Sequence, residues 1–436
     1  MYGEAITYGE AITYGEAITY GEEATMSDAL HPSDSTVVVV GASLAGLRAC
    51  ETLREESFTG RIVLIGAEGH LPYDRPPLSK EILQGKWDAD KLLLRRGGIE
   101  DLNLDFRRPT RAAALDSAKR VVTLESGEEI SYDGLVIATG ARPRRLEMAD
   151  GFEGVHYLRT LDDAMALRAD LDAIQLRGAP RVAVIGAGFI GCEVASSCRQ
   201  RGLDVTVIEP LAAPMVRALG RHLGGLAGLL HRDNGVDMRC ATTLTAIEGE
   251  GRVQRLRLGD GRIVAIDALV VGVGVVADTT WLDGSGLELE DGVVCDERCS
   301  AAPGVVAAGD VARWKSLRRA GFGVRIEHWT HASAQGRAAA LRLLRGADGV
   351  EPFDPIPYVW TDQFGVKIQV VGHPSPDDEL HLVDGTFEEY RFVALFAREG
   401  RLTGVVGMRR SRLVMGYQAM LEEGVDIAHA LANPPS

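Results

Sequence analysis

The chain has 436 residues, enough for about three domains, and its apolar fraction of 46% and charged fraction of 25% are ordinary for a globular protein. A formal charge of −15 argues against a nucleic acid or an anionic membrane as the main partner. No apolar run approaches the roughly 20 residues of a membrane span, and no signal-peptide pattern opens the chain. We therefore expect a cytoplasmic protein.

The chain begins with a tandem repeat, YGEAIT three times and then YGEEAT, over residues 2–25. A six-residue unit in four copies is too small to enclose a core. We expect residues 1–34 to form a disordered tail, with Met26 as a candidate for the original start.

The first β-α-β unit carries a dinucleotide-binding pattern. Four valines at 37–40 predict a buried parallel strand, and GASLAG at 41–46 follows with the spacing G-x-G-x-x-G, in which Ser43 takes the middle place. Small residues here allow a tight turn, a close approach to a pyrophosphate and close packing of the next helix. The alternative is a tight turn in another kind of α/β protein. Ala67 stands where a ribose-binding acid is expected, and Glu68 is the nearest carboxylate.

A proline pair, Pro76 and Pro77, predicts an extended segment ahead of a helix. We expect Ser79 to cap that helix and Lys80 and Glu81 to lie in its first turn. A lysine opposes the helix dipole at this position, which indicates a functional role for Lys80. The alternative is a solvated surface lysine.

The second dinucleotide pattern has all three glycines. A predicted strand leads into Gly186, Gly188 and Gly191, and the strand after the next helix ends at Glu209. An acid at this distance binds the ribose hydroxyls of NAD and repels a 2′-phosphate. Strand, glycines, helix and acid together predict NAD binding.

Three later strands end in small or acidic residues. One strand within 132–143 ends in Ala-Thr-Gly, which indicates backbone packed against a ligand or another strand, and another apolar strand is predicted within 268–278. The strand within 304–314 ends at Asp310, which is placed for a ligand hydroxyl or, alternatively, for capping the next helix. A helix is predicted over 328–344.

The pattern changes from about residue 351. Alternating apolar residues, as in KIQVVG and YRFVALF, predict antiparallel strands. A closing helical segment is predicted to include residues 417–421.

With these motifs in order, the sequence resembles the glutathione-reductase-like flavoproteins. It is most similar to the NADH-dependent ferredoxin reductases of the putidaredoxin reductase and rubredoxin reductase group. The resemblance covers about residues 35–425 and rests on GASLAG (41–46), PYDRPPLSK (72–80), ATGARP (138–143), LRTLDDA (158–164), GAGFIGCEVA (186–195), GVGVVAD (272–278), AAGDVA (307–312), EHWTHASAQGRAAA (327–340) and PYVWTDQFGVKIQVVG (357–372).

This resemblance implies an α/β fold with two Rossmann-like dinucleotide-binding domains, for FAD and NAD, and a C-terminal α+β domain. The FAD-binding domain is implied to consist of two segments with the NAD-binding domain inserted between them. The implied division is a tail at 1–34, the first FAD-binding segment at 35–145, the NAD-binding domain at 146–269, the second FAD-binding segment at 270–350 and the C-terminal domain at 351–436.

The resemblance also implies cofactor contacts. Lys80, Trp329 and Trp360 would lie by the isoalloxazine, Asp310 by the ribityl chain and Ala112 by the adenine. The full set is Gly41, Ser43, Leu44, Ala45, Gly46, Ala67, Glu68, Arg75, Lys80, Ala112, Gly140, Arg142, Gly186, Gly188, Phe189, Ile190, Gly191, Glu193, Glu209, Gly274, Asp310, Trp329 and Trp360.

The chain departs from the family pattern at three places. Ala67 replaces Asp, Ala277 and Asp278 replace Pro-Asn, and His331 replaces Asn. Because Ala67 has no carboxylate, we expect Glu68 to bind the adenosine ribose instead.

Cysteine chemistry is not expected. The six cysteines form neither a C-x-x-C motif nor a metal-ligand cluster with histidines, and we interpret Cys295 and Cys299 as incidental thiols. The first FAD helix holds only Cys50, where disulfide-reducing relatives have C-x-x-x-x-C.

The implied activity is that of an FAD-dependent NADH:ferredoxin oxidoreductase. Hydride would pass from nicotinamide C4 to flavin N5, and single electrons would then pass to an iron–sulfur ferredoxin that supplies an oxygenase such as cytochrome P450. Alternatives are a flavoreductase with another acceptor (rubredoxin, oxygen or a quinone) and a redox-state binding protein like the apoptosis-inducing flavoproteins. The acidic charge counts against the last.

Two further expectations concern charge. Glu209 should select NADH over NADPH. Some of six arginines should form a basic patch near the flavin edge for an acidic ferredoxin, against the alternative of scattered solvated side chains. These arginines are Arg107, Arg108, Arg318, Arg319, Arg409 and Arg410.

The most specific expectation joins Lys80 and Glu193. Each would open the helix beside one cofactor, and the two side chains would form a buried ion pair, within about 4 Å, between flavin and nicotinamide. The alternative is two unconnected surface charges.

Overall fold

The computed structural model describes residues 29–178 and 180–435. Residues 1–28 of the expected tail lie outside this range. The chain is bound to the first domain already before residue 35: Leu30 N donates to Leu343 O, and Pro32 O accepts from the N–H groups of Thr59 and Gly60. The expected boundary of the tail at residue 34 is therefore late by several residues.

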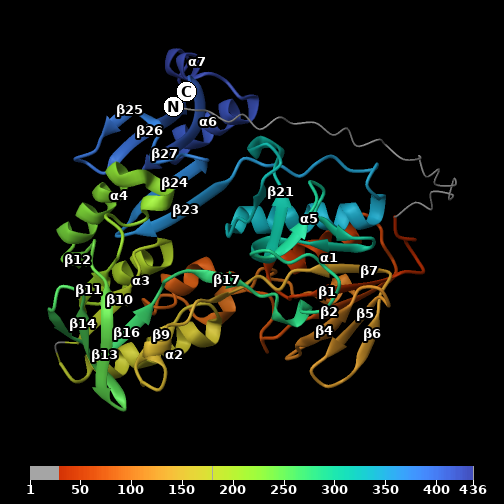
Figure 1. Cartoon of the computed structure of the whole chain (residues 1–436), viewed down its shortest axis with the longest axis horizontal. Coiled ribbons are helices and arrows are strands. Elements are labelled where there is room, and N and C mark those ends of the chain that lie inside the picture. Colours follow the sequence, from red (N-terminus) through yellow and green to blue (C-terminus); the bar gives the residue numbers. More distant parts are fainter. Residues whose placement is uncertain (1–28, 179, 436) are drawn as a thin grey trace, which may run out of the picture.

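The first domain, expected to bind FAD, is built on a six-stranded sheet of order β19-β20-β7-β1-β2-β3 (Figure 1). Val38 and Val40 pack towards the small sheet β4-β5-β6, whereas Val37 and Val39 pack towards helices α1 and α5. Burial on both faces explains the unbroken run of valines. The elements are β1 (Thr36–Val40), α1 (Leu44–Glu55), β2 (Arg61–Ile65), β3 (Asp105–Arg107), β4 (Ala112–Asp116), β5 (Val121–Leu124), β6 (Glu129–Ser131), β7 (Gly134–Ile137), β19 (Ser300–Ala302), β20 (Val305–Ala307) and α5 (Trp329–Arg345).

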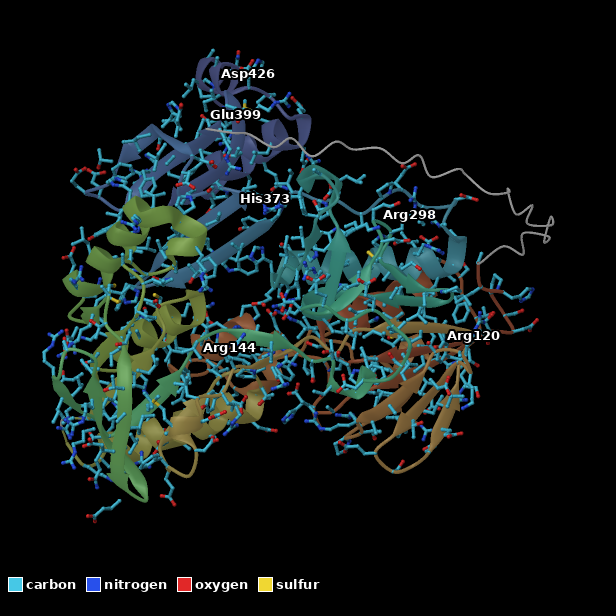
Figure 2. The ribbon with its side chains drawn as sticks, viewed as in Figure 1. Arg120, Arg144, Arg298, His373, Glu399 and Asp426 are labelled. Atoms are coloured by element: carbon cyan, nitrogen blue, oxygen red, sulfur yellow. The ribbon has the colours of Figure 1, made fainter. Side chains whose placement is uncertain are left out.

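Three short strands extend this domain: β18 (Val293–Cys295), β21 (Ala312–Lys315) and β22 (Gly323–Val324). Its link to the second domain is a two-stranded ribbon of β8 (Ala141–Pro143) and β17 (Val275–Ala277). Figure 2 shows Arg144 at this link.

The second domain, expected to bind NAD, has a five-stranded parallel sheet of order β12-β11-β10-β16-β9. The helices α2, α3 and α4 lie on one face, and the antiparallel β13-β14-β15 sheet covers the other. The elements are β9 (Val155–Tyr157), α2 (Leu161–Gln175), β10 (Arg181–Ile185), α3 (Phe189–Gln200), β11 (Asp204–Ile208), α4 (Val216–Asp233), β12 (Asp237–Arg239), β13 (Leu244–Glu250), β14 (Arg252–Leu258), β15 (Ile263–Ala265) and β16 (Ala268–Val271).

The segment 268–278 forms two strands in different sheets, and the expectation of one strand is wrong. β16 runs to Val271 in the second domain, and β17 starts at Val275 in the link. Gly274 between them has φ +98°, a conformation that ends a strand. The expected domain boundary after residue 269 thus falls inside β16.

The C-terminal domain is a five-stranded antiparallel sheet of order β23-β24-β27-β26-β25, with α6 on one face. Its other face packs against the second domain and shares that domain's core. His373 follows β24 on the side that faces the first domain (Figure 2). The elements are β23 (Tyr358–Gln363), β24 (Val366–Gly372), β25 (Glu379–Thr386), β26 (Arg391–Arg398), β27 (Arg401–Met408), α6 (Ser411–Glu423) and α7 (Ile427–Ala432).

The expected helix that begins with Lys80 is absent. Residues Pro76–Ser79 form a short 3₁₀ helix, and Lys80 follows its end. Ser79 is the last residue of this 3₁₀ helix and not the cap of a following one, and its hydroxyl donates to the carboxylate of Glu193. Among the described helices, none is long and apolar enough to cross a membrane.

Candidate functional site

The first dinucleotide turn joins β1 to α1. Gly41 has φ +117°, and a Cβ there would lie 2.1 Å from Ala138 O; a Cβ on Gly46 would lie 1.9 Å from Gly41 O. The chain's own packing therefore requires both glycines. Ser43 is the N-cap of α1 but its side chain makes no capping hydrogen bond, which leaves the first N–H groups of the helix for another acceptor. This end of α1 fits a pyrophosphate.

The second turn, between β10 and α3, repeats this geometry. Gly186 has φ +95° with a would-be Cβ 2.3 Å from Gly272 O, and a Cβ on Gly191 would lie 2.0 Å from Gly186 O. A Cβ on Gly188, however, would meet nothing within 4 Å. The protein itself leaves this space free, as expected of a glycine that admits a ligand.

Glu209 follows β11 and is 7% exposed. Its Oε2 accepts from Ala187 N at 2.7 Å, and its Oε1 accepts from Leu211 N at 2.8 Å. The carboxylate thus holds the dinucleotide turn in place, and each oxygen keeps a second lone pair for a ribose hydroxyl. Its contact with ribose stays a prediction.

Lys80 and Glu193 form the expected ion pair. Lys80 Nζ lies 2.9 Å from Glu193 Oε1, and the two side chains are 12% and 7% exposed. Ser79 Oγ donates to Glu193 Oε2 at 2.5 Å. The pair connects the loop after η1 (Pro76–Ser79) of the first domain to the second turn of α3. The prediction that the two side chains form a buried ion pair is confirmed, although neither residue opens a helix.

The C-terminal domain supplies further donors that the sequence analysis missed. Thr361 Oγ1 donates to Glu193 Oε1 at 2.7 Å, and Asp362 N lies 3.3 Å from the same oxygen. Both residues are on β23, next to Trp360. The family motif at 357–372 marked this strand, but only its tryptophan was assigned a role.

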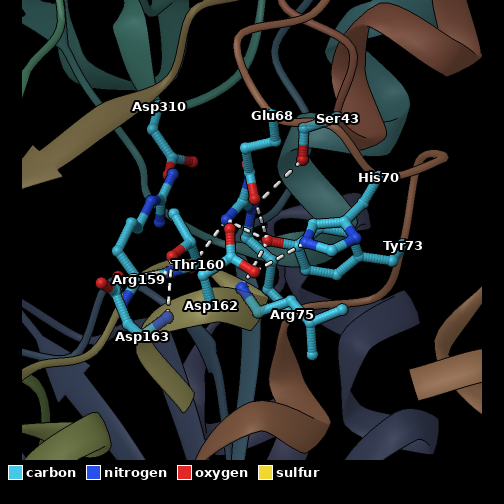
Figure 3. A network of polar contacts seen from close by, with 11 residues as sticks. Ser43, Glu68, His70, Tyr73, Arg75, Arg159, Thr160, Asp162, Asp163 and Asp310 are labelled. Carbon is cyan, nitrogen blue, oxygen red and sulfur yellow. Dashed lines mark hydrogen bonds and ion pairs between the residues drawn. The ribbon is translucent and has the colours of Figure 1, made fainter. Parts of the chain in front are cut away.

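A second polar network surrounds Arg75 (Figure 3). Arg75 Nη2 is 2.7 Å from Glu68 Oε1, and Tyr73 Oη donates to Glu68 Oε2 at 2.5 Å. Burial raises the pKa of Tyr73 well above its usual range, and the adjacent Glu68 adds to this shift, so the hydroxyl remains a donor. Both oxygens of Glu68 are thus engaged within the protein, and its contact with the adenosine ribose stays a prediction.

Arg75 also connects this network to other regions of the site. Its Nε lies 3.3 Å from Ser43 Oγ, and its Nη1 donates to Arg159 O at 2.6 Å. Arg159 Nη2 in turn lies 3.0 Å from Asp310 Oδ2 (Figure 3). The structure therefore brings together Ser43, Arg75 and Asp310, and adds Arg159, which the sequence analysis missed.

Trp329 and Trp360 also come together, with ring centroids 6.3 Å apart. Trp329 Nε1 donates to Asp74 Oδ1 at 2.7 Å. Burial raises the pKa of Asp74, and the hydrogen bond from Trp329 opposes that shift. The two tryptophans thus connect the start of α5 to β23, beside the Lys80 loop.

The other expected contacts lie at element ends. Arg142 on β8 is half exposed, with its Nε 4.0 Å from Asp278 Oδ1. Ala112 begins β4, and Ala67 is exposed after β2. At the two dinucleotide turns, Leu44 and Ala45 are buried, Phe189 is half-buried and Ile190 is exposed. Gly140, between β7 and β8, has φ +73°.

None of the six cysteines forms a disulfide. All six are unpaired, and burial raises the pKa of Cys50 to about 12. Burial also raises the pKa of Cys295 and Cys299, which keeps both as thiols. Within the described residues there is no group of ligands for a metal ion.

The six arginines considered for docking are spread over several elements. Arg107 pairs with Asp105 on β3, and Arg410 pairs with Asp384 on β25, whereas Arg318 Nε donates to the backbone carbonyl of Asp354. These local partners offset some of the positive charge. A shared basic patch stays a prediction.

Comparison with known proteins decides the family. The sequence model described as pyridine nucleotide-disulphide oxidoreductase matches residues 35–336, and that of the reductase C-terminal domain matches residues 358–436. The chain belongs to the pyridine nucleotide-disulphide oxidoreductase family. This result confirms the resemblance inferred from the motifs, the α/β fold with its α+β C-terminal domain, and the cofactors FAD and NAD(H) that the family implies.

Individual members of this oxidoreductase family match over most of their length. The ferredoxin–NAD(+) reductase component of the p-cumate 2,3-dioxygenase system of Pseudomonas putida is 37% identical over 341 residues, covering 78% of this chain and 81% of the relative. Rhodocoxin reductase of Rhodococcus erythropolis is 34% identical over 392 residues, covering 88% and 89%. The reductase in the covalent putidaredoxin reductase–putidaredoxin complex superposes with a TM-score of 0.86 at 29% identity, covering 92% and 96%.

Proposed function

We propose that this oxidoreductase passes electrons from NADH through FAD to an iron–sulfur ferredoxin, which supplies an oxygenase such as a cytochrome P450. The observation that carries the proposal is the Lys80–Glu193 pair, which connects the loop of one nucleotide domain to the helix of the other at 2.9 Å. The relatives named for a dioxygenase system and for a putidaredoxin complex support ferredoxin as the acceptor.

The residues of both dinucleotide turns fit the two cofactors. The uncapped start of α1 would hold the FAD pyrophosphate, with Asp310 at the ribityl chain, and the open space at Gly188 would admit NADH. Bound FAD supplies the redox chemistry, because it accepts electrons in pairs and releases them singly. The chain's own residues bind and orient both cofactors.

The two oxygens of Glu193 differ in availability. Oε1 receives Lys80 Nζ, Thr361 Oγ1 and Asp362 N, whereas Oε2 receives Ser79 Oγ. A carboxylate oxygen accepts about two hydrogen bonds comfortably. Oε2 is therefore the atom available to the carboxamide of the nicotinamide, and Lys80 Nζ provides positive charge beside the flavin.

The acceptor is tested by NADH-dependent reduction of cytochrome c with and without added ferredoxin. Strong stimulation by ferredoxin supports the proposal. Rapid oxygen consumption without stimulation would instead indicate the alternative acceptors, and absence of turnover would indicate a redox-state binding protein. We place this activity in the cytoplasm, which agrees with six unpaired thiols.

A further inference from the structure

A buried chain of hydrogen bonds runs from the second domain through the C-terminal domain to Glu193. His231 Nε2 on α4 lies 2.9 Å from Gln363 Oε1, and Gln363 Nε2 donates to Thr361 Oγ1 at 3.1 Å. Thr361 Oγ1 donates to Glu193 Oε1 at 2.7 Å. His231, Gln363 and Thr361 are all 0% exposed, so water does not compete for these contacts.

The chemistry of these groups sets the direction of every bond. The Glu193 carboxylate can only accept, so the single hydroxyl proton of Thr361 points to it. The hydroxyl oxygen then accepts from the amide nitrogen of Gln363, and the amide oxygen of Gln363 accepts from the ring of His231. His231 must therefore carry its proton on Nε2.

The surroundings of His231 agree with this tautomer. Its Nδ1 has no hydrogen-bond partner among the described residues, as suits an unprotonated nitrogen beside the ring of Phe364. Burial lowers the pKa of His231 to about 4, so the ring is neutral at pH 7. Gln363 Nε2 also lies 3.5 Å from Met215 Sδ, which helps to hold the amide in one orientation.

This chain of hydrogen bonds matters because it ends at Glu193, which is also bound by residues of the first domain. From the first domain, Ser79 and Lys80 bind its carboxylate, and from the C-terminal domain Thr361 does so. Opposed donors on two sides fix a carboxylate in one rotamer, whereas donors on one side allow it to follow the Lys80 loop. A shift of about 1 Å in a residue that orients a reacting group can slow a reaction about a hundredfold.

We propose that Thr361, supported by Gln363 and His231, is a positioning residue that holds Glu193 for nicotinamide. This inference rests on the proposed function, in which Glu193 lies between flavin and nicotinamide. It assigns the C-terminal domain a role in the reaction with NADH, in addition to any role in binding the electron acceptor.

Thr361→Val tests the inference because valine keeps the shape and loses the hydroxyl. The rate of flavin bleaching by NADH, measured by stopped flow on the FAD-loaded protein, should fall about tenfold or more, with a smaller change in NADH affinity. Thr361→Ser keeps the hydroxyl and should restore most of the rate.

Thr403→Val is the matched control. Thr403 Oγ1 donates to Asp378 Oδ2 at 2.7 Å, and the side chain of Asp378 is also fully buried, but this pair lies in the C-terminal domain without contact to Glu193. Its loss should lower the melting temperature without slowing flavin bleaching. Equal rates in Thr361→Val and Thr403→Val would overturn the inference.

A second readout is independent of turnover. In protein labelled with ¹⁵N-histidine, the His231 ring should be neutral with its proton on Nε2 between about pH 5 and 8, and Gln363→Leu should shift that N–H signal. A proton on Nδ1 of His231 would contradict the hydrogen-bond directions assigned from His231 to Glu193. Glu193→Gln distinguishes failure of the proposed function from failure of this inference. If Glu193→Gln leaves flavin bleaching unchanged, the proposed role of Glu193 fails. If Glu193→Gln slows bleaching and Thr361→Val does not, only the positioning role of Thr361 fails.

Discussion

Lys80 Nζ and Glu193 Oε1 lie 2.9 Å apart although the residues are 113 positions apart in the chain. Each charge would be unfavourable if buried alone, and together with Ser79 and Thr361 they satisfy one another. The pair therefore holds the two nucleotide domains in register at the point where their cofactors would meet.

The second dinucleotide turn predicts different effects for two similar substitutions. Gly188→Ala adds a Cβ into open space at φ −74°, so the protein should fold with an unchanged melting temperature. The KM for NADH should nevertheless rise about tenfold, because the methyl group takes room from the ligand.

Gly191→Ala is the matched comparison within the same turn. Its Cβ would lie 2.0 Å from Gly186 O, so the substitution should reduce the free energy of unfolding by about 3 kcal/mol. Denaturant unfolding and NADH titration of both variants test this pair of predictions. A destabilised Gly188→Ala protein would show that the turn is packed differently.

Glu209 should set the preference for NADH over NADPH. Glu209→Ala should lower the ratio of kcat/KM for NADH to that for NADPH about tenfold, because a 2′-phosphate no longer meets a like charge. It should also destabilise the domain by about 1–3 kcal/mol, since Ala187 N and Leu211 N lose their acceptors. Equal use of both coenzymes by the unmodified protein would refute this account of Glu209.

Buried histidines should make the fold sensitive to mild acid. Burial lowers the pKa of His231 and His328 to about 4 and that of His331 to about 3. The unfolded chain binds these protons near pH 6.5, so stability is full above that pH and is lost as pH falls towards 4. Each histidine should contribute about 2 kcal/mol of loss between pH 6.5 and 5.

His331→Asn, which introduces the residue that the family resemblance implies at this position, should remove one such contribution. Urea unfolding at pH 7, 6 and 5 measures the difference, and the variant should show the shallower decline. The same slope in both proteins would mean that His331 is not buried in its neutral form.

The local units of this fold were predictable, and the contacts between distant segments were not. The valines of β1, Gly41 and Gly46 lie within one β-α turn, so the sequence pattern contains the whole steric argument. Lys80 and Glu193 could be paired because the family motifs contain both residues. The helix-dipole argument for Lys80 was wrong, since no helix begins at that residue.

Ser79 shows why the remaining contacts were missed. Its short polar side chain favours a helix cap locally, yet its hydroxyl donates to a carboxylate 114 positions away. Thr361 lies 168 positions from the same carboxylate, and no local pattern distinguishes it from an ordinary strand residue. Only the packing of three domains brings these groups to one carboxylate.

The central claim is that the Lys80–Glu193 pair acts between the two cofactors. Stopped-flow reduction of the FAD-loaded protein by NADH tests it most directly in Lys80→Ala, with Lys119→Ala, an exposed lysine bound to Asp116, as the control. The account predicts that Lys80→Ala retains FAD but bleaches at least about tenfold more slowly, and that Lys119→Ala matches the unmodified protein. Unchanged bleaching in Lys80→Ala with FAD bound would contradict it.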